Sequence, residues 1–274
     1  MYFLLGDVLS MNVKAVYFSP TGGTEKIARA VAQGLSENYE AYDFTLPGAR
    51  ERTFEFGAED VVVFAVPVYA GRVPNVLLKF LNGQIYGNGA AAVPVVVYGN
   101  RNFDDGLIEL GNILSEHGFR LLAGGAFIAE HSFSRVLAAG RPDGDDIALA
   151  GSFGRRCGEK LSRWDGEDVR LPGCTPLRAY YQPRDRKGEP VNILKVKPRT
   201  NEKCIRCGIC ARSCPMGSIS YDDYSEFTGI CIKCGACEKK CPVGAKYYDD
   251  PGYIYHRTEL ELGYARRAEP VIVL

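Results

Sequence analysis

Short apolar runs alternate with amphipathic segments through the first 165 residues. The apolar runs cover residues 13–18, 60–66, 93–98 and 126–129. Between and after them, apolar positions recur at helical spacing over residues 25–37, 75–81, 104–117 and 147–161. The runs are short and rich in β-forming residues, so each is predicted to be a buried strand. Strands that alternate with helices predict a doubly wound α/β domain built on a parallel sheet.

The loop after the first run is rich in hydroxyl groups and glycine. It contains Ser19, Thr21, Gly22, Gly23 and Thr24 and leads directly into the helix predicted over 25–37. N–H groups of such a loop and of a helix N-terminus converge on one point and can bind an anion. The loop has neither the Gly-Lys-Ser/Thr of a P-loop nor a dinucleotide fingerprint. The alternative is a plain glycine-rich turn in which Thr24 caps the helix.

Two further loops follow strand ends. The second run is followed by Pro67, Val68, Tyr69, Ala70 and Gly71, and the third by Gly99, Asn100, Arg101, Asn102 and Phe103. Ligands of open α/β sheets bind at the carboxyl ends of the strands, so we expect all three loops to meet at one crevice. His131 follows the fourth run. It either approaches the ligand as a proton source or, as is commoner, holds its own loop by hydrogen bonds.

Two near-copies of one cysteine motif lie between residues 204 and 242. The first is Cys204-x2-Cys207-x2-Cys210-x3-Cys214-Pro215, and the second is Cys231-x2-Cys234-x2-Cys237-x3-Cys241-Pro242. This spacing is that of bacterial two-cluster ferredoxins, in which the fourth cysteine of each run binds the other cluster. We therefore predict two 4Fe–4S clusters. The predicted ligand sets are Cys204, Cys207, Cys210 and Cys241 for one cluster, and Cys231, Cys234, Cys237 and Cys214 for the other.

Disulfides and zinc are the alternative uses of these cysteines. Disulfides are typical of small secreted chains, and residues 1–10 do not form a signal peptide. We interpret those residues as an over-extended start or a frayed arm. Zinc knuckles use paired Cys-x2-Cys units with a different spacer and four ligands per ion. Two complete runs, each ending in Cys-Pro, favour iron–sulfur clusters.

Composition narrows the class of protein further. The 274 residues carry 33 basic and 33 acidic side chains, so no overall charge favours a nucleic acid or a membrane surface as partner. No apolar run approaches the ~18 residues that a membrane helix needs. Cluster assembly and the two remaining cysteines, predicted to be free thiols, indicate a reducing compartment and hence the cytoplasm.

The chain is predicted to divide into four parts. They are the doubly wound domain with its anion-binding loop at 12–165, a linker at 166–198, a cluster domain at 199–250 and a tail at 251–274. The linker is rich in proline, and seven basic residues against two acidic ones lie between 178 and 199. We interpret this stretch as a solvated charged linker, with a docking site for an acidic partner as the alternative. In the tail we expect a helix near 257–266 and an apolar end that docks on the body of the protein.

The loop that runs from Ser19 to Thr24 is similar to the phosphate loop of flavodoxins, with glycine in place of asparagine. The loops at 67–71 and 99–103 occupy the places of the two flavin-ring loops. The chain as a whole resembles the fused flavodoxin–ferredoxin electron carriers of anaerobes. This resemblance implies a flavodoxin-like five-stranded parallel sheet of order 2-1-3-4-5, a small α+β two-cluster ferredoxin domain, and one FMN. It makes Tyr69 and Phe103 the candidates for stacking on the flavin ring.

These features indicate electron transfer, because no nucleophile or general-base dyad stands out and the cofactors carry the chemistry. The predicted function is a relay of low-potential electrons between the two clusters and the FMN, serving redox partner proteins or small electron acceptors. The alternatives are an FMN-dependent reductase of a quinone or nitro compound fed by the clusters, and a redox sensor. A crevice covered by the cluster domain would favour the relay, and an open one would favour the reductase.

Overall fold

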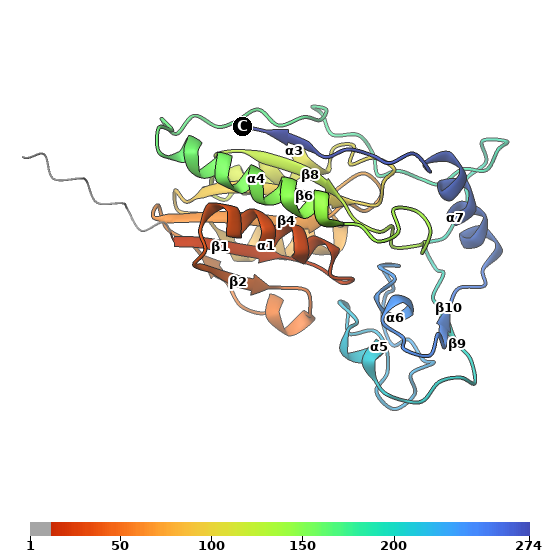
Figure 1. Ribbon diagram of the computed structural model, residues 1–274. Coiled ribbons are helices and arrows are strands. Elements are labelled where there is room, and N and C mark those ends of the chain that lie inside the picture. The colour runs from red at the N-terminus through yellow and green to blue at the C-terminus, as the bar shows by residue number, and fades with distance from the viewer. Residues whose placement is uncertain (1–11) are drawn as a thin grey trace, which may run out of the picture.

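The computed structural model describes residues 12–274, and the interpretation of residues 1–10 falls outside them. A central sheet covered by helices lies beside a small cysteine-rich unit (Figure 1). The sheet contains β1 (Asn12–Tyr17), β2 (Tyr39–Asp43), β4 (Asp60–Pro67), β6 (Ala91–Tyr98), β7 (Arg120–Leu121), β8 (Gly124–Ile128) and β11 (Val271–Val273). The longer helices are α1 (Gly23–Leu35), α2 (Leu78–Gln84), α3 (Gly106–Glu116), α4 (Gly144–Leu161) and α7 (Pro251–Gly263). Short elements complete this domain: η1 (Pro47–Arg50), η2 (Asn75–Leu77), β3 (Phe54–Glu55) and β5 (Ile85–Tyr86).

The strand order confirms the predicted fold. Along the main path of the sheet the order is β11-β8-β6-β4-β1-β2. The strands β2, β1, β4, β6 and β8 pair in parallel with one another. Counted along the chain, these five have the order 2-1-3-4-5, which is that of the flavodoxin-like doubly wound fold. The sheet is larger than predicted, because β7 pairs with β6 and β11 pairs antiparallel with β8.

The central strands are apolar on both faces because helices cover both faces. All eight residues of β6 and the first seven of β4 are buried. On one face, α1 and α4 pack against the sheet around Val31 and Phe153, and Figure 1 shows these two helices side by side. On the other face, α2 and α3 contribute Leu81 and Leu110. The strand ends therefore lie at a rigid edge.

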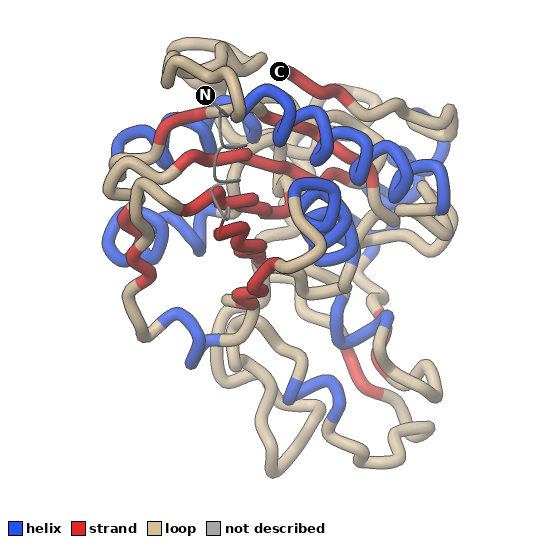
Figure 2. The backbone as a smooth tube through the Cα atoms, turned by 60° about the vertical axis from the view of Figure 1, so that its left-hand side comes forward, coloured by secondary structure: helices blue, strands red, loops and turns tan. Residues whose placement is uncertain are grey.

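The cysteine-rich unit is small and consists largely of loops (Figure 2). It contains β9 (Arg199–Thr200), α5 (Ile209–Arg212), α6 (Ala236–Lys239) and β10 (Lys246–Tyr247), and β9 pairs antiparallel with β10. The two short helices begin in the same way. Gly208 precedes α5 with a φ of 73°, and Gly235 precedes α6 with a φ of 74°. Glycine adopts this left-handed conformation without strain, so the repeated sequence produces a repeated turn.

The stretch at 166–198 has no helix or strand, and it lies against the sheet domain. Arg178 forms an ion pair with the buried carboxylate of Asp105, at 2.5 Å. The Tyr180 hydroxyl donates to the carbonyl of Val73 (2.9 Å), and the Tyr181 N–H donates to the carbonyl of Ala70 (2.8 Å). This basic stretch is therefore partly engaged by the sheet domain rather than free in solvent.

The tail first forms α7 and then returns to the sheet. The helix starts at Pro251, earlier than the predicted 257–266, because the Asp250 carboxylate accepts a hydrogen bond from the Tyr253 N–H (2.8 Å) and caps the helix. Beyond the helix, the amide group of Asn100 holds the tail backbone. It donates to the carbonyl of Tyr264 (2.6 Å) and accepts from the N–H of Ala268 (3.1 Å).

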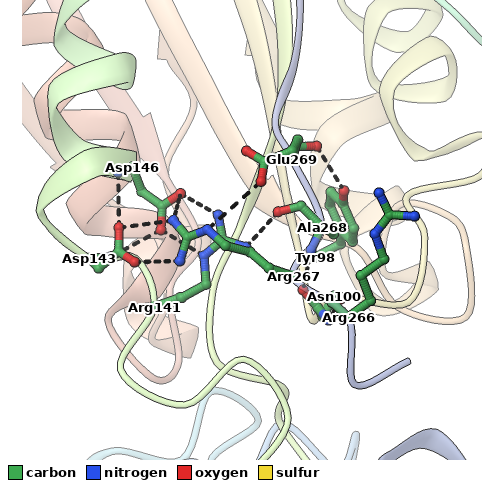
Figure 3. Close-up of polar contacts among 9 residues, drawn as sticks. All are labelled: Tyr98, Asn100, Arg141, Asp143, Asp146, Arg266, Arg267, Ala268 and Glu269. Carbon is green, nitrogen blue, oxygen red and sulfur yellow. Dashed lines mark hydrogen bonds and ion pairs between the residues drawn. The ribbon is translucent and has the colours of Figure 1, made fainter. Parts of the chain in front are cut away.

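A charged cluster secures the same segment (Figure 3). Arg141 and Asp146 form a buried ion pair, in which Nε lies 2.8 Å from Oδ2. Arg141 also donates to the carbonyl of Ala268 (2.7 Å), and Arg267 pairs with Asp143 at 2.6 Å. The tail strand β11 is thus held at the sheet edge by both backbone pairing and charge.

We expect Asp146→Ala to lower the free energy of unfolding by about 3–5 kcal/mol, because it leaves the Arg141 guanidinium buried without its partner. Arg267→Ala is the matched control, because its side chain is 45% exposed. Its loss should cost about 1 kcal/mol or less. Urea denaturation followed by circular dichroism measures both values. Equal losses in the two variants would contradict this account of the cluster.

Candidate functional site

A crevice lies where the loops after β1, β4, β6 and β8 meet. It consists of a cavity of about 60 Å³ at the α1 end and a cavity of about 420 Å³ beside it. The residues of the three predicted loops that line it are Thr21, Gly23, Thr24, Pro67, Val68, Tyr69, Ala70, Gly71, Gly99, Arg101 and Asn102. The larger cavity falls within the size range of small-molecule and cofactor sites.

The smaller cavity contains the features of an anion site. The N-cap of α1 is Gly22, with a φ of 92°, which has no side chain to cap the helix, and of the first-turn N–H groups only that of Glu25 donates to a side chain, that of Ser19, among the described residues. The alternative in which Thr24 is the N-cap is therefore wrong, and Thr24 instead lies within the first turn and lines the cavity. The first N–H groups of a helix have no intrahelical partner, and the helix dipole favours negative charge there. The geometry therefore fits a phosphate group.

Four of the predicted site residues do not line either cavity: Ser19, Gly22, Asn100 and Phe103. The Ser19 hydroxyl supports the loop by accepting a hydrogen bond from the Glu25 N–H (2.9 Å). Asn100 is occupied with the tail. Phe103 packs on Tyr98, with ring centroids 5.7 Å apart. Of the two predicted stacking residues, Tyr69 alone lines the crevice.

The larger cavity is also lined by side chains that the sequence did not indicate as site residues. They come from the linker, the cluster domain and α7, and include Tyr180, Tyr181, Ile232, Lys233, His256 and Leu260. The adjacent tyrosines in a proline-rich stretch are the one signal that could have been noticed. The other residues reach the crevice through tertiary packing, which no local pattern reports.

His131 lies over Gly99 and lines both cavities. A Cβ atom at Gly99 would come within 2.4 Å of the His131 ring, so only glycine fits there. The Nδ1 atom of His131 accepts a hydrogen bond from the Phe133 N–H (3.1 Å). Burial, with a contribution from the nearby Lys239 ammonium, lowers the pKa of His131 to about 3. The ring is therefore neutral at pH 7, which favours the loop-holding interpretation over a proton source.

The cysteines gather in two sets, and the sets are those predicted from the crossed ferredoxin pattern. One cavity is lined by Cys231, Cys234, Cys237 and Cys214, which we call the proximal set. Another is lined by Cys204, Cys207, Cys210 and Cys241, which we call the distal set. In each set the fourth sulfur belongs to the other motif and accepts a main-chain hydrogen bond. The donors are the N–H of Ala245 for Cys241 (3.1 Å) and that of Ser218 for Cys214 (3.4 Å).

The chemistry of the donor sets fits iron. Burial raises the pKa of Cys234 to about 12 and that of Cys237 further still. Thiolates in such surroundings require a positive charge at the centre of the set, which iron supplies. At Cys241 burial acts to raise the pKa, but main-chain N–H groups of residues 243–246 outweigh it and lower the pKa. Hydrogen bonds of this kind to cluster sulfurs stabilise the thiolate form.

The proximal set lies directly beside the crevice. Cys234 lines the smaller cavity together with Thr21, and Cys231 lines the larger cavity together with Tyr69. Burial raises the pKa of Tyr69, and the neighbouring thiols of Cys234 and Cys231 raise it further. The distal set lies at the surface, where Cys207 is exposed and Ile205 is 61% exposed.

Comparison with known proteins gives one family match and several similar solved structures. Residues 203–245 match the family model of the 4Fe-4S dicluster domain. No curated protein matches the chain significantly. Among solved structures, a flavodoxin from the domain Archaea is 14% identical, with a TM-score of 0.40, over 56% of this chain and 99% of that one. A flavodoxin from Streptococcus pneumonia TIGR4 is 19% identical, with a TM-score of 0.36, over 55% and 97%. An apo NADH:FMN oxidoreductase is 19% identical, with a TM-score of 0.39, over 56% and 90%.

The strand order and the family match together define the class of protein. The sheet domain has the flavodoxin-like fold by its own topology, and residues 203–245 are similar to the 4Fe-4S dicluster domains. The chain therefore joins a domain of flavodoxin-like fold to a unit that resembles a 4Fe-4S dicluster domain. No helix within the described part of the chain is long and apolar enough to cross a membrane.

We expect Cys214→Ser to damage the cluster held by the second motif, although Cys214 stands in the first. The reason is that Cys214 lines the cavity of Cys231, Cys234 and Cys237. Cys241→Ser is the matched variant and should damage the other cluster. EPR spectra of the reduced variants, compared with the unaltered protein, identify the lost signal. If Cys214→Ser loses the EPR signal of the cluster at the first motif, and Cys241→Ser that of the cluster at the second, the crossed assignment is wrong.

Proposed function

We propose that this chain carries electrons between two 4Fe–4S clusters and one FMN, linking a low-potential donor to an acceptor. The donor and acceptor are redox proteins or small electron carriers. A 4Fe–4S cluster exchanges one electron at a time, and a flavin exchanges one or two. A chain that holds both can therefore connect one-electron and two-electron partners. The eight cysteines of the two motifs support a reducing compartment, the cytoplasm, as the location of this function.

The observation that carries the proposal is the position of the proximal set. Cys231 and Cys234 line the same cavities as the loops at the strand ends. A cluster bound by these thiols would adjoin whatever the crevice holds. The distal set, with its exposed Cys207, is placed to exchange electrons with a partner at the surface. The proposed order is therefore surface, distal cluster, proximal cluster and flavin, in either direction.

The residues of the crevice support FMN as its ligand. Thr21, Gly23 and Thr24 line the cavity that is suited to a phosphate, at the start of α1. Tyr69 and the glycines of the other two loops border the larger cavity, which the flavin ring would occupy. Residues 230–233 of the cluster domain form part of the wall of this cavity. A wall that brings the cluster domain against the proposed flavin site supports the relay over a reductase of a small substrate.

FMN rather than FAD is expected to copurify with the protein, and Thr21→Ala is expected to weaken its binding. The loss of one hydrogen bond to a charged group costs about 1.5–3 kcal/mol. The dissociation constant for FMN should therefore rise at least about tenfold. Thr53→Ala, which alters an exposed threonine away from the crevice, is the control. Fluorescence titration of the apoprotein measures both constants. Unchanged affinity in Thr21→Ala, or a stoichiometric amount of FAD, would count against the proposal.

Electron transfer from the clusters to the flavin is expected to occur within one chain. The two domains are covalently joined and in contact, so their effective concentration is at least in the millimolar range that short linkers give. Rapid mixing with dithionite, followed at flavin and cluster wavelengths, gives the rate of flavin reduction after cluster reduction. The proposal predicts a rate that does not change with protein concentration. A rate proportional to concentration would show transfer between molecules, and the relay would have to be abandoned.

A further inference from the structure

The hydrogen bonds between the cluster domain and the sheet domain share one feature: they fall next to ligands of the proximal set. Arg50 donates to the carbonyl of Pro215 (2.5 Å), directly after Cys214. Arg135 donates to the carbonyl of Glu238 (3.0 Å), directly after Cys237. The sheet domain is thus attached where the proximal cluster would be held.

The most extensive of these contacts is made by Lys239 at the end of α6. Its ammonium group lies 2.5 Å from a carboxylate oxygen of Glu130, 2.6 Å from the carbonyl of His131 and 2.9 Å from the carbonyl of Ser134. An ammonium has three N–H donors, and all three are used. The side chain is only 12% exposed. A charge removed from water to this extent is stable only when such acceptors surround it.

A second contact lies at the start of the same helix and depends on the absence of a side chain. A Cβ atom at Gly235 would come within 2.3 Å of the Ser132 carbonyl oxygen, so the two backbones meet where only glycine fits. Gly208 has the equivalent position and the same φ in the first motif. Its Cβ would instead approach the end of the flexible Arg212 side chain and the Tyr224 hydroxyl, both within the cluster domain. The glycine is required for domain docking only at 235.

The loop that receives α6 also borders the crevice. Glu130, His131 and Ser132 line the smaller cavity together with Cys234. The helix therefore docks on a loop that lines the proposed flavin site next to the proximal set. Any movement of α6 relative to this loop changes the distance between the two cofactors.

We propose that the docking of α6 on residues 130–135, through Lys239 and Gly235, fixes the separation of the proximal cluster from the flavin and so sets the rate of electron transfer between them. Lys239 is thus a positioning residue and exchanges no electron itself. In each transfer one electron leaves the reduced cluster, which is oxidised by one equivalent, and enters the flavin, which is reduced by one equivalent. This inference rests on the proposed function.

The test compares Lys239→Met with Lys240→Met, because Lys240 is the exposed neighbour. Iron, sulfide and flavin contents are measured first, then amide hydrogen exchange at residues 130–135, then the intramolecular rate after reduction with dithionite. In Lys239→Met we expect amide hydrogen exchange at residues 130–135 to rise at least about tenfold, because a buried charge contact between the two surfaces is lost. We expect the rate of intramolecular electron transfer to fall at least about tenfold for the same reason. Lys240→Met should match the unaltered protein in all three.

Three further variants keep the test decisive if Lys239→Met assembles poorly. Glu130→Gln weakens the same contact from the sheet domain, outside the cysteine motifs, and should change exchange and rate in the same directions. Gly235→Ala and Gly208→Ala carry the same backbone strain, but only Gly235→Ala should raise exchange at 130–135.

Unaltered exchange and rate in Lys239→Met and Glu130→Gln would overturn the inference. If the unaltered protein itself shows no intramolecular transfer, the proposed function fails first. That result is distinct, because hydrogen exchange reports the docking contact whether or not electrons flow.

Discussion

A cubane cluster needs four thiolates that converge on one small volume, and neither cysteine motif lines one cavity with all four of its own cysteines. Three cysteines of one motif line each cavity, and the fourth comes from the other motif. The two halves of the cluster domain must therefore fold around each other. Burial raises the pKa of the innermost thiols, so the iron itself is expected to complete the fold. Everything else in the proposed relay depends on where this unit is held.

The remainder of the chain holds that unit against one edge of a rigid sheet. The parallel sheet places three loops at the carboxyl ends of its strands. The linker runs over the sheet domain through Arg178 and Tyr181, and the tail returns through α7 to pair as β11 with β8. The cluster domain is thus connected to the sheet domain on both its N-terminal and its C-terminal side. Such double attachment limits its motion and keeps the proximal set beside the crevice.

The sequence predicted those features that local chemistry determines. Buried strands such as β4 and β6 produce continuous apolar runs, and the cysteine spacing specifies the crossed ligand sets. The edge strand β2 is not predicted, because its residues are exposed or only partly buried and leave no apolar pattern. The helix α7 was placed too late, although Asp250 and Pro251 form a recognisable helix start.

Only part of the candidate site could be predicted, because some of its residues are brought there by tertiary packing rather than by their place at a strand end. Thr21, Thr24 and Tyr69 lie at strand ends, so the topology alone brings them together. Asn100 follows a strand in the same way but binds the tail, and this depends on a segment more than 160 residues away. Lys233, His256 and Leu260 reach the crevice through the packing of separate domains. Contacts of that kind follow from tertiary structure and leave no periodic signal in the sequence.

The central claim is that one chain holds two clusters and one flavin. The most direct measurement is the iron, sulfide and flavin content of protein purified without oxygen, together with its visible spectrum. The account predicts about eight irons, eight sulfides and one FMN per chain, because each ligand set holds one 4Fe–4S cluster. Four irons or fewer in folded protein, or a crevice that retains no flavin, would contradict it.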